Sequence, residues 1–223
     1  AMVVPTLNPD SIRFAGAGQS RNSYEISTRS TMEAIRRATV GGNGELGFWD
    51  DMDHDRMFWF QTDLALLYMA PSQIPSIVVA ANTAGRYRSK GLMSWDPVKS
   101  LGWRGPYMTP PGASYPSNRS ADGFNNYYYN STLNPKYFID AWGNPIVVQF
   151  PSKYGSVTLD LSNPVHNQYY IDNTRMVSAG RNGKLDTELN LRGLPNGMPD
   201  YAYMKANTIL LGDDIIVFFF KDF

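Results

Sequence analysis

The first regular pattern of hydrophobic and polar positions along the chain begins at Tyr24. From there, apolar or threonine side chains recur at steps of three and four residues, the spacing of one helix face. They are Tyr24, Thr28, Thr31 or Met32, Ile35 and Ala38. The pattern predicts a helix over about residues 24–40, which ends at the paired glycines Gly41-Gly42. Ser30 and Glu33 also fit a capping box, which would begin the helix later.

A second pattern, of β-branched and aromatic runs, predicts strands in the C-terminal half. Residues 146–150 follow the turn Gly143-Asn144-Pro145, and residues 175–180 and 214–220 are expected to be their partners. Residues 156–161 alternate and predict a further strand, in a hairpin with 146–150. The expected fold class is α+β, with the N-terminal helix packed on a small antiparallel sheet.

The turn segment Asp140–Pro145, which contains Trp142, is expected to organise the domain. A large aromatic ring in a tight turn gains most when it packs against a neighbouring element. We therefore expect Trp142 to be largely buried and to pin the turn to the N-terminal helix or to the sheet.

The remaining segments have weaker patterns. The 223 residues are expected to form one domain. Residues 1–22 lack periodicity and contain proline and glycine, so they predict a flexible arm. Residues 72–139 predict a loop-rich insertion with Tyr127–Tyr129 near its centre. Those tyrosines either form a surface for a partner or glycan, or pack the loop onto the domain.

Composition excludes several classes of function. The 20 basic and 20 acidic residues balance, which argues against a nucleic-acid footprint and a polybasic membrane patch. No cysteine is present, so neither disulfides nor cysteine metal sites can form. No run of about 18 apolar residues occurs, so the sequence shows no transmembrane helix.

Motifs for catalysis are weak throughout the chain. We find no nucleophile elbow, zinc-protease helix or phosphate loop, and predict no catalytic or cofactor-binding residue. His166 lies in a polar segment that reads as a turn. Asp51, Asp53 and Asp55 match the first EF-hand ligand spacings, but Arg56 stands where that loop needs glycine, so we interpret them as a solvated acidic loop. The chain is expected not to be an enzyme.

Four short motifs follow one another along the chain. They are Trp103–Tyr107, Asp140–Pro145, Ser178–Gly183 and Gly212–Ile215. Together they resemble the globular domain of the G-type, or major, pseudopilins of type II secretion. That family has a similar Trp-Gly-Asn-Pro turn, a following Ser-x-Gly-x-Asp-Gly loop and a late Ala-Asp-Ile segment. The resemblance covers roughly residues 28–50 and 100–220.

The resemblance implies a pilin-like fold, with the helix at 24–40 as the lower part of a longer spine helix. It implies that the arm 1–22 follows a removed N-terminal membrane helix. A protein of this kind is a structural subunit of an extracytoplasmic pseudopilus or type IV pilin-like filament involved in protein secretion. Its partners are other pilin-like subunits and the inner membrane, and it works in the periplasm or at the cell surface.

The resemblance also implies a calcium site. In that family the ion lies between the last glycine motif and the final acidic segment. The matching ligands here are the backbone carbonyl of Ala179 and the side chains of Asn182, Asp186, Asp213 and Asp214. Asn182 stands where the family has aspartate, and the loop between Gly183 and Gly212 is much longer. The alternative is that these acids only solvate a loop and end a strand.

Two other classes of function stay open. One is an extracytoplasmic module that binds a ligand or glycan, with the tyrosine-rich insertion as its binding face. The other is a hydrolase that uses an unmarked pair of carboxylates, which we rank last.

Overall fold

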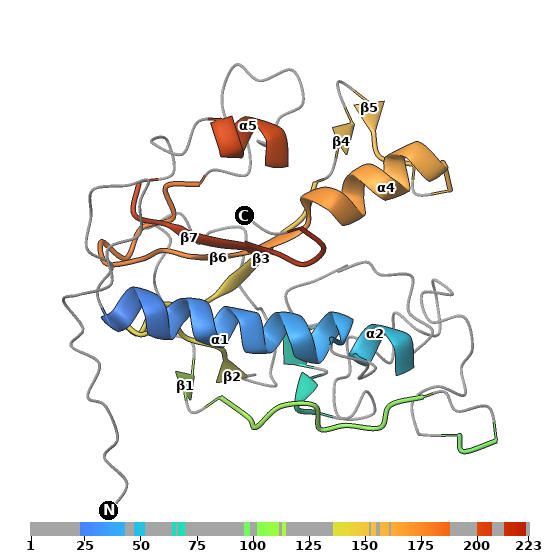
Figure 1. Cartoon of the computed structure of the whole chain (residues 1–223), viewed down its shortest axis with the longest axis horizontal. Helices are drawn as coiled ribbons and strands as arrows, with labels where there is room; N and C mark the ends of the chain where they lie inside the picture. Colours follow the sequence, from blue (N-terminus) through green and yellow to red (C-terminus); the bar gives the residue numbers. More distant parts are fainter. Residues whose placement is uncertain are drawn as a thin grey trace, which may run out of the picture.

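The protein folds as a mixed α+β structure in a computed structural model (Figure 1). The structure describes residues 23–42, 47–51, 64–65, 67–69, 96–98, 102–111, 113–114, 136–151, 153–154, 157–160, 162–187, 200–206 and 212–221. The helices are α1 (Ser23–Val40), α2 (Phe48–Asp51), α4 (Pro164–Asn173) and α5 (Tyr201–Ala206). The strands are β1 (Ala113–Ser114), β2 (Lys136–Tyr137), β3 (Val147–Gln149), β4 (Lys153–Tyr154), β5 (Val157–Thr158), β6 (Arg175–Ser178) and β7 (Ile215–Phe218).

The central sheet has three antiparallel strands in the order β3-β6-β7. Met176 in the middle strand lies opposite Val148 on one side and Val217 on the other. All residues of the three strands are buried, so the sheet is covered on both faces. The α+β class and these three strands are as the sequence predicted. The finer pilin-like arrangement stays a prediction.

Helix α1 begins at Ser23, so the early start is correct and the capping-box start at Ser30 is wrong. The buried stripe extends back to Thr28, and an ion pair of 3.2 Å between Arg29 and Glu25 supports the first turns. Burial of that stripe therefore outweighs the local capping preference of Ser30. The helix ends as expected, and the Gly41 N–H donates to the Arg37 carbonyl at 2.9 Å.

The expected strand at residues 156–161 is not part of the central sheet, and its pairing with 146–150 is wrong. Instead β5 pairs with β4, with Tyr154 opposite Val157, in a separate hairpin. Pro151, which follows β3 closely, has no N–H to donate to a continuing strand ladder. The chain therefore leaves the sheet and turns back on itself.

Helix α4 replaces what the sequence indicated as a polar turn around His166. The Asn163 side chain caps it by accepting the Val165 N–H at 2.9 Å, and Pro164 occupies the first turn. An asparagine before proline is a recognised helix start, so the sequence contained the signal. His166 lies inside this helix, and its Nδ1 accepts the backbone N–H of Asp160 at 3.1 Å.

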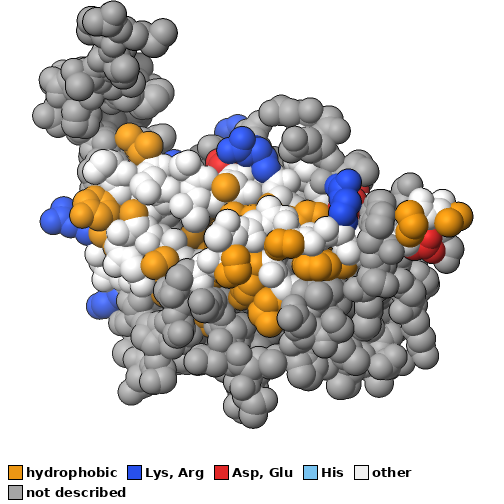
Figure 2. All heavy atoms as spheres, turned by 90° about the horizontal axis from the view of Figure 1, so that it is seen from below, with side chains coloured by type: hydrophobic (Ala, Val, Ile, Leu, Met, Phe, Trp, Pro, Cys, Tyr) orange, Lys and Arg blue, Asp and Glu red, His pale blue; other side chains and the backbone are white. Residues whose placement is uncertain are grey.

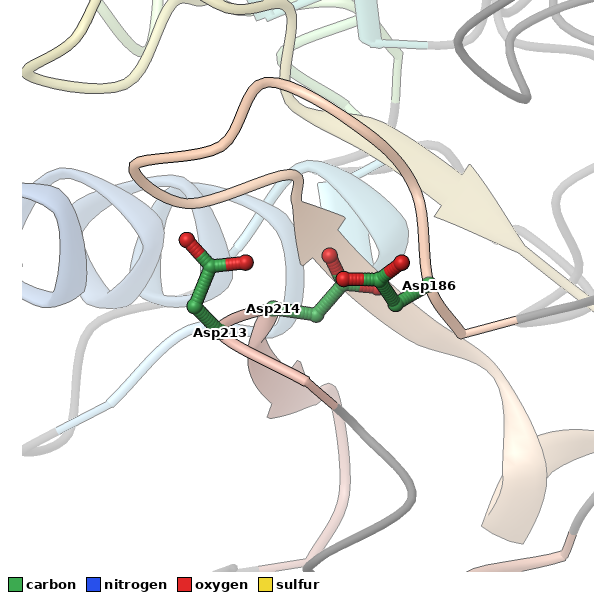
Figure 3. Close-up of side chains that lie close together, drawn as sticks. All are labelled: Asp186, Asp213 and Asp214. Carbon is green, nitrogen blue, oxygen red and sulfur yellow. The ribbon is translucent and has the colours of Figure 1, made fainter.

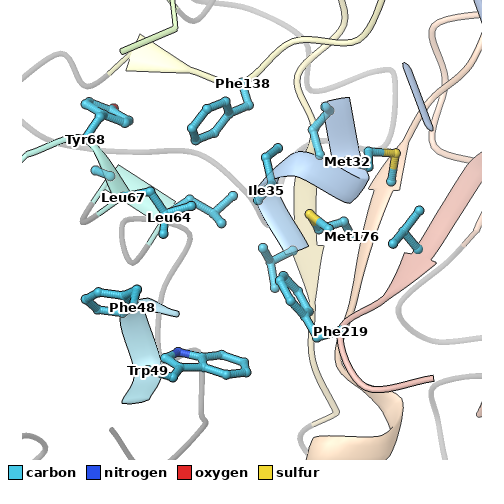
Figure 4. Packing of buried hydrophobic residues seen from close by; sticks show 14 of the residues in the cluster. Met32, Ile35, Phe48, Trp49, Leu64, Leu67, Tyr68, Phe138, Met176 and Phe219 are labelled. Carbon is cyan, nitrogen blue, oxygen red and sulfur yellow. The ribbon is translucent and has the colours of Figure 1, made fainter. Parts of the chain in front are cut away.

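Two clusters of hydrophobic side chains pack on opposite faces of the sheet. The larger joins α1 to alternate strand residues and to Phe48 and Trp49 of α2 (Figure 4). The smaller covers the other face, where Met204 of α5 and Leu185 pack on the sheet. The long excursion between residues 184 and 211 thus carries the helix that covers the second face.

Most of Trp142 is buried against the larger cluster, and its ring stacks on Tyr24 of α1 at 5.8 Å, so it pins the turn as expected. The expectation about Asp51 is wrong. Asp51 is buried, not solvated: its Oδ2 accepts Arg104 Nε–H at 3.0 Å and the Tyr107 hydroxyl at 2.8 Å. Asp53 and Asp55 lie outside the described residues.

The arm 1–22 and Tyr127–Tyr129 also lie outside the described residues. Strands β1 and β2 pair antiparallel on either side of residues 115–135. Within the described part of the chain, no helix has the length and apolar character needed to cross a bilayer. On the face seen from below, hydrophobic side chains lie over the middle of the described surface, and Lys and Arg side chains lie toward its edges (Figure 2).

Candidate metal centre

Three carboxylates gather where the loop after β6 meets the entrance of β7 (Figure 3). Asp186 comes from that loop, and Asp213 and Asp214 immediately precede β7. One carboxylate oxygen from each lies within 4.8 Å of the others. Carboxylate oxygens at this spacing can share one hard cation such as calcium. The structure therefore brings together all three acidic residues that the sequence assigned to the site.

Asp214 is the member of this group withdrawn from solvent. Its Oδ2 accepts the Thr187 N–H at 2.6 Å, whereas its buried Oδ1 has no hydrogen-bond partner. Burial raises the pKa of Asp214 to about 7 from an ordinary 3.8, and the nearby Asp186 charge adds to that rise. The hydrogen bond from the Thr187 N–H lowers the pKa and so opposes that rise. An enclosed carboxylate oxygen without a donor is a position where a cation compensates lost solvation.

Asn182 bridges two of the acids through hydrogen bonds. Its backbone N–H donates to Asp213 Oδ2 at 2.8 Å, and its side-chain NH₂ donates to Asp186 Oδ2 at 2.7 Å. Its amide oxygen accepts the Lys184 N–H at 2.6 Å. The amide thus presents its NH₂ group to the acids and holds Asp186 in place by hydrogen bonding. The ligand role of Asn182 stays a prediction.

Two glycines allow the loop and the β7 entrance to approach closely. Gly180 and Gly212 have φ of 58° and 60°, which side chains rarely adopt. A Cβ at Gly180 would collide with the Asp213 carbonyl, and one at Gly212 with the Asp186 carboxylate. Sequence reasoning did not assign these roles. Gly180 and Gly212 belong to two of the four motifs described above. Only the folded structure shows that they lie against the Asp213 carbonyl and the Asp186 carboxylate.

A buried hydrogen-bond network connects the loop that carries the acidic residues to the turn at Asp140–Pro145. Asp140 Oδ1 accepts the N–H groups of Trp142 and Asn144 at 2.9 and 2.7 Å. Its Oδ2 accepts the Ser178 hydroxyl at 2.7 Å. The Asn144 side chain then donates to the Gly180 carbonyl at 2.8 Å. The turn and the acidic loop are thus held as one unit.

The same network reaches helix α1. The Ala141 N–H donates to the Thr28 hydroxyl at 3.0 Å, beside the stack of Tyr24 on Trp142. Asp140, Ser178 and Thr187 are site-supporting residues that sequence reasoning missed, because their role depends on contacts between distant segments. Ala179, the expected backbone ligand, is fully buried beside this network, and its ligand role stays a prediction.

Comparison of the chain with models of protein families, with curated proteins and with solved structures gave no match. The resemblance to pseudopilins therefore rests on the four motifs, and functional conclusions rest on the geometry of the described residues.

Proposed function

We propose that the chain is a structural subunit of an extracytoplasmic pilin-like filament involved in protein secretion. The observation that carries the proposal is the contact between three motifs of the resemblance. Asp140 bonds to Ser178, Asn144 to the Gly180 carbonyl, and the Asn182 N–H to Asp213. Motifs that are scattered in sequence but joined in space are the parts of one framework, and that framework is attached to α1.

The gene sequence upstream of residue 3 is a direct test. A filament subunit should be preceded by a short basic leader, a processing glycine and an apolar stretch with glutamate at its fifth position. Cross-linking of intact source cells, followed by antibody detection, should then give a ladder at multiples of the subunit mass. A conventional cleaved signal peptide together with a single monomer band would contradict the proposal and favour a ligand-binding module.

We further propose that Asp186, Asp213 and Asp214 hold a calcium ion. The buried Oδ1 of Asp214 is the observation that favours a cation here, since it lacks any hydrogen-bond donor. Calcium would neutralise the repulsion among three carboxylates within 4.8 Å. It would also tie the loop after β6 to the entrance of β7.

Calcium dependence should appear in the melting temperature of the purified chain. We expect a chelator to lower it and calcium to restore it better than magnesium, which requires tighter octahedral geometry. An ion that binds only the folded state adds about 2.7 kcal/mol at a hundredfold excess over its dissociation constant. The measurement belongs above neutral pH, because protons compete with cations at Asp214.

Two variants make this experiment specific. Asp214→Ala should abolish the calcium response, whereas Asp160→Ala, which removes an exposed acid elsewhere, should retain it. A melting temperature that ignores both chelator and calcium, in protein shown to be metal-free, would leave the acids as loop solvation. The filament proposal would survive that result, because Asn182 already provides two hydrogen bonds across the loop.

A further inference from the structure

We propose that Asn182 is a site of spontaneous covalent modification, at which water converts its side-chain amide into a carboxylate. Asn182 is exposed in the turn after β6 and is followed directly by Gly183. Asparagine is one of the thermally labile residues, and a following glycine favours its loss of ammonia. The modification itself is independent of any metal, whereas its effect on calcium binding rests on the calcium site proposed above.

The main chain supplies the nucleophile for this reaction. The nitrogen of Gly183 attacks Cγ of Asn182, so that a new N–Cγ bond closes a cyclic imide and the bond from Cγ to Nδ2 breaks. The proton of the Gly183 N–H passes through water to Nδ2, which leaves as ammonia. A second water molecule then breaks the new bond, giving its hydroxyl group to Cγ and its other proton to the nitrogen of Gly183. The net reaction turns one amide and one water into a carboxylic acid and ammonia.

The local structure favours attack on this particular amide. Gly183 has no Cβ, so its nitrogen is less crowded than that of any other residue type. The Lys184 N–H donates to Asn182 Oδ1 at 2.6 Å, and this oxygen gains negative charge when Cγ is attacked. Because nucleophile and amide belong to adjacent residues, the attack is also intramolecular. The exposed side chain leaves the site open to the water that completes the reaction.

The modification reverses the interaction between residue 182 and Asp186. The Asn182 NH₂ group now donates to Asp186 Oδ2 at 2.7 Å. A carboxylate at residue 182 has no hydrogen to donate, so it repels the acid that the amide attracts. Asp186, Asp213 and Asp214 already have carboxylate oxygens within 4.8 Å of one another. The modified loop is therefore less stable without a cation, and it offers a cation one more carboxylate.

The reaction thus changes how the loop after β6 is held against the entrance of β7. In the unmodified chain, the side chain of Asn182 bonds to Asp186, and its backbone N–H donates to Asp213 Oδ2 at 2.8 Å. These bonds need no metal. In the modified chain, the side-chain bond is lost, and a cation is needed to neutralise the added charge. Because the reaction does not reverse in water, the protein becomes more dependent on calcium as it ages.

Incubation of the folded chain at neutral pH tests the modification. Mass spectrometry of peptides should show that oxygen has replaced the NH₂ group at residue 182. Peptides are needed because Asn43 and Asn196 also precede glycine. Asn182→Gln is the matched control, since its longer side chain cyclises far more slowly and should keep its amide.

Two results would overturn the modification. One is a folded chain that keeps the amide of Asn182 throughout an incubation that converts the urea-unfolded chain. The other is a product that contains only isoaspartate, in which the ring has opened at the main-chain carbonyl. Fragment spectra distinguish isoaspartate from aspartate, because isoaspartate adds a carbon to the main chain.

Asn182→Asp tests the effect on calcium binding, because this variant carries the product side chain from the start. In chelator it should melt below the unmodified chain, and calcium should raise its melting temperature by more. Calcium titration should show binding at least about tenfold tighter, since the number of charged ligands shifts the affinity of such sites by decades. Circular dichroism with calcium present checks that the variant folds.

An affinity no higher than that of the unmodified chain, or an unchanged melting temperature in chelator, would overturn this effect. If neither chain responds to calcium, the calcium site proposed above is wrong. The peptide masses at residue 182 then still decide whether the modification occurs, because that measurement involves no metal.

Discussion

Individual residues in this protein act mainly through close approach and hydrogen bonding, and glycine is the clearest case. Gly212 and Gly143 both have positive φ, but their surroundings differ. A Cβ at Gly212 would meet the Asp186 carboxylate, whereas one at Gly143 would meet nothing within 4 Å. Comparing the two positions therefore separates the cost of the backbone conformation from the cost of crowding the Asp186 carboxylate.

Gly212→Ala should lower stability more than Gly143→Ala. The backbone term is about 1–2 kcal/mol for a residue with a Cβ in the left-handed region, and both variants incur it. Only Gly212→Ala also displaces Asp186, so only that variant should lose the calcium response. Urea unfolding with and without calcium measures both effects. Equal losses of stability and an intact calcium response in both variants would show that Asp186 moves aside freely.

At the scale of elements, one buried side chain connects three segments. The Asp140 side chain accepts hydrogen bonds from backbone N–H groups of its own turn and from the Ser178 hydroxyl at the end of β6. The same turn also reaches α1, because the Ala141 N–H donates to the Thr28 hydroxyl. All of these acceptor roles need a carboxylate that carries no hydrogen atoms. Asp140, which belongs to neither element, therefore holds the turn that bonds to α1 against the end of β6.

Asp140→Asn should destabilise the fold by about 1–3 kcal/mol, the cost of leaving buried polar groups unpaired. Four groups now donate to Asp140: the Ser178 hydroxyl, the Asn144 side-chain amide, and the N–H groups of Trp142 and Asn144. In either orientation, the new NH₂ group of asparagine would face two of these donors, and a donor cannot accept their hydrogen bonds. Asp160→Asn, an exposed acid in another turn, is the matched control and should change stability little. If Asp140→Asn and Asp160→Asn had the same free energy of unfolding, this role for Asp140 would be refuted.

At the scale of the whole molecule, the sequence predicted the helices and strands whose residues follow a clear local pattern. Helix α1 and strands β3, β6 and β7 have strong periodicity or β-branched runs, so their existence could be predicted. Helix α5 has six residues, too few to show a period, and it forms because Met204 is buried on the sheet. The enclosure of Asp214 depends on a distant contact, with Thr187, which no local pattern encodes.

The two hydrophobic clusters share one sheet, so they should unfold together. Met32 of α1 and Met204 of α5 are both fully buried, on opposite faces of the strands. Met32→Ala and Met204→Ala should each lower the unfolding free energy by about 2–5 kcal/mol. Because the sheet separates the two sites, the double variant should lose close to the sum of the two single losses.

Two optical signals test whether both clusters unfold together. Tryptophan fluorescence includes Trp49, Trp103 and Trp142, which pack in or against the larger cluster, and far-ultraviolet circular dichroism reports all elements. Their unfolding transitions should coincide in every variant. If Met204→Ala separated the two transitions, α5 and the second face would form an independent unit rather than part of one cooperative fold.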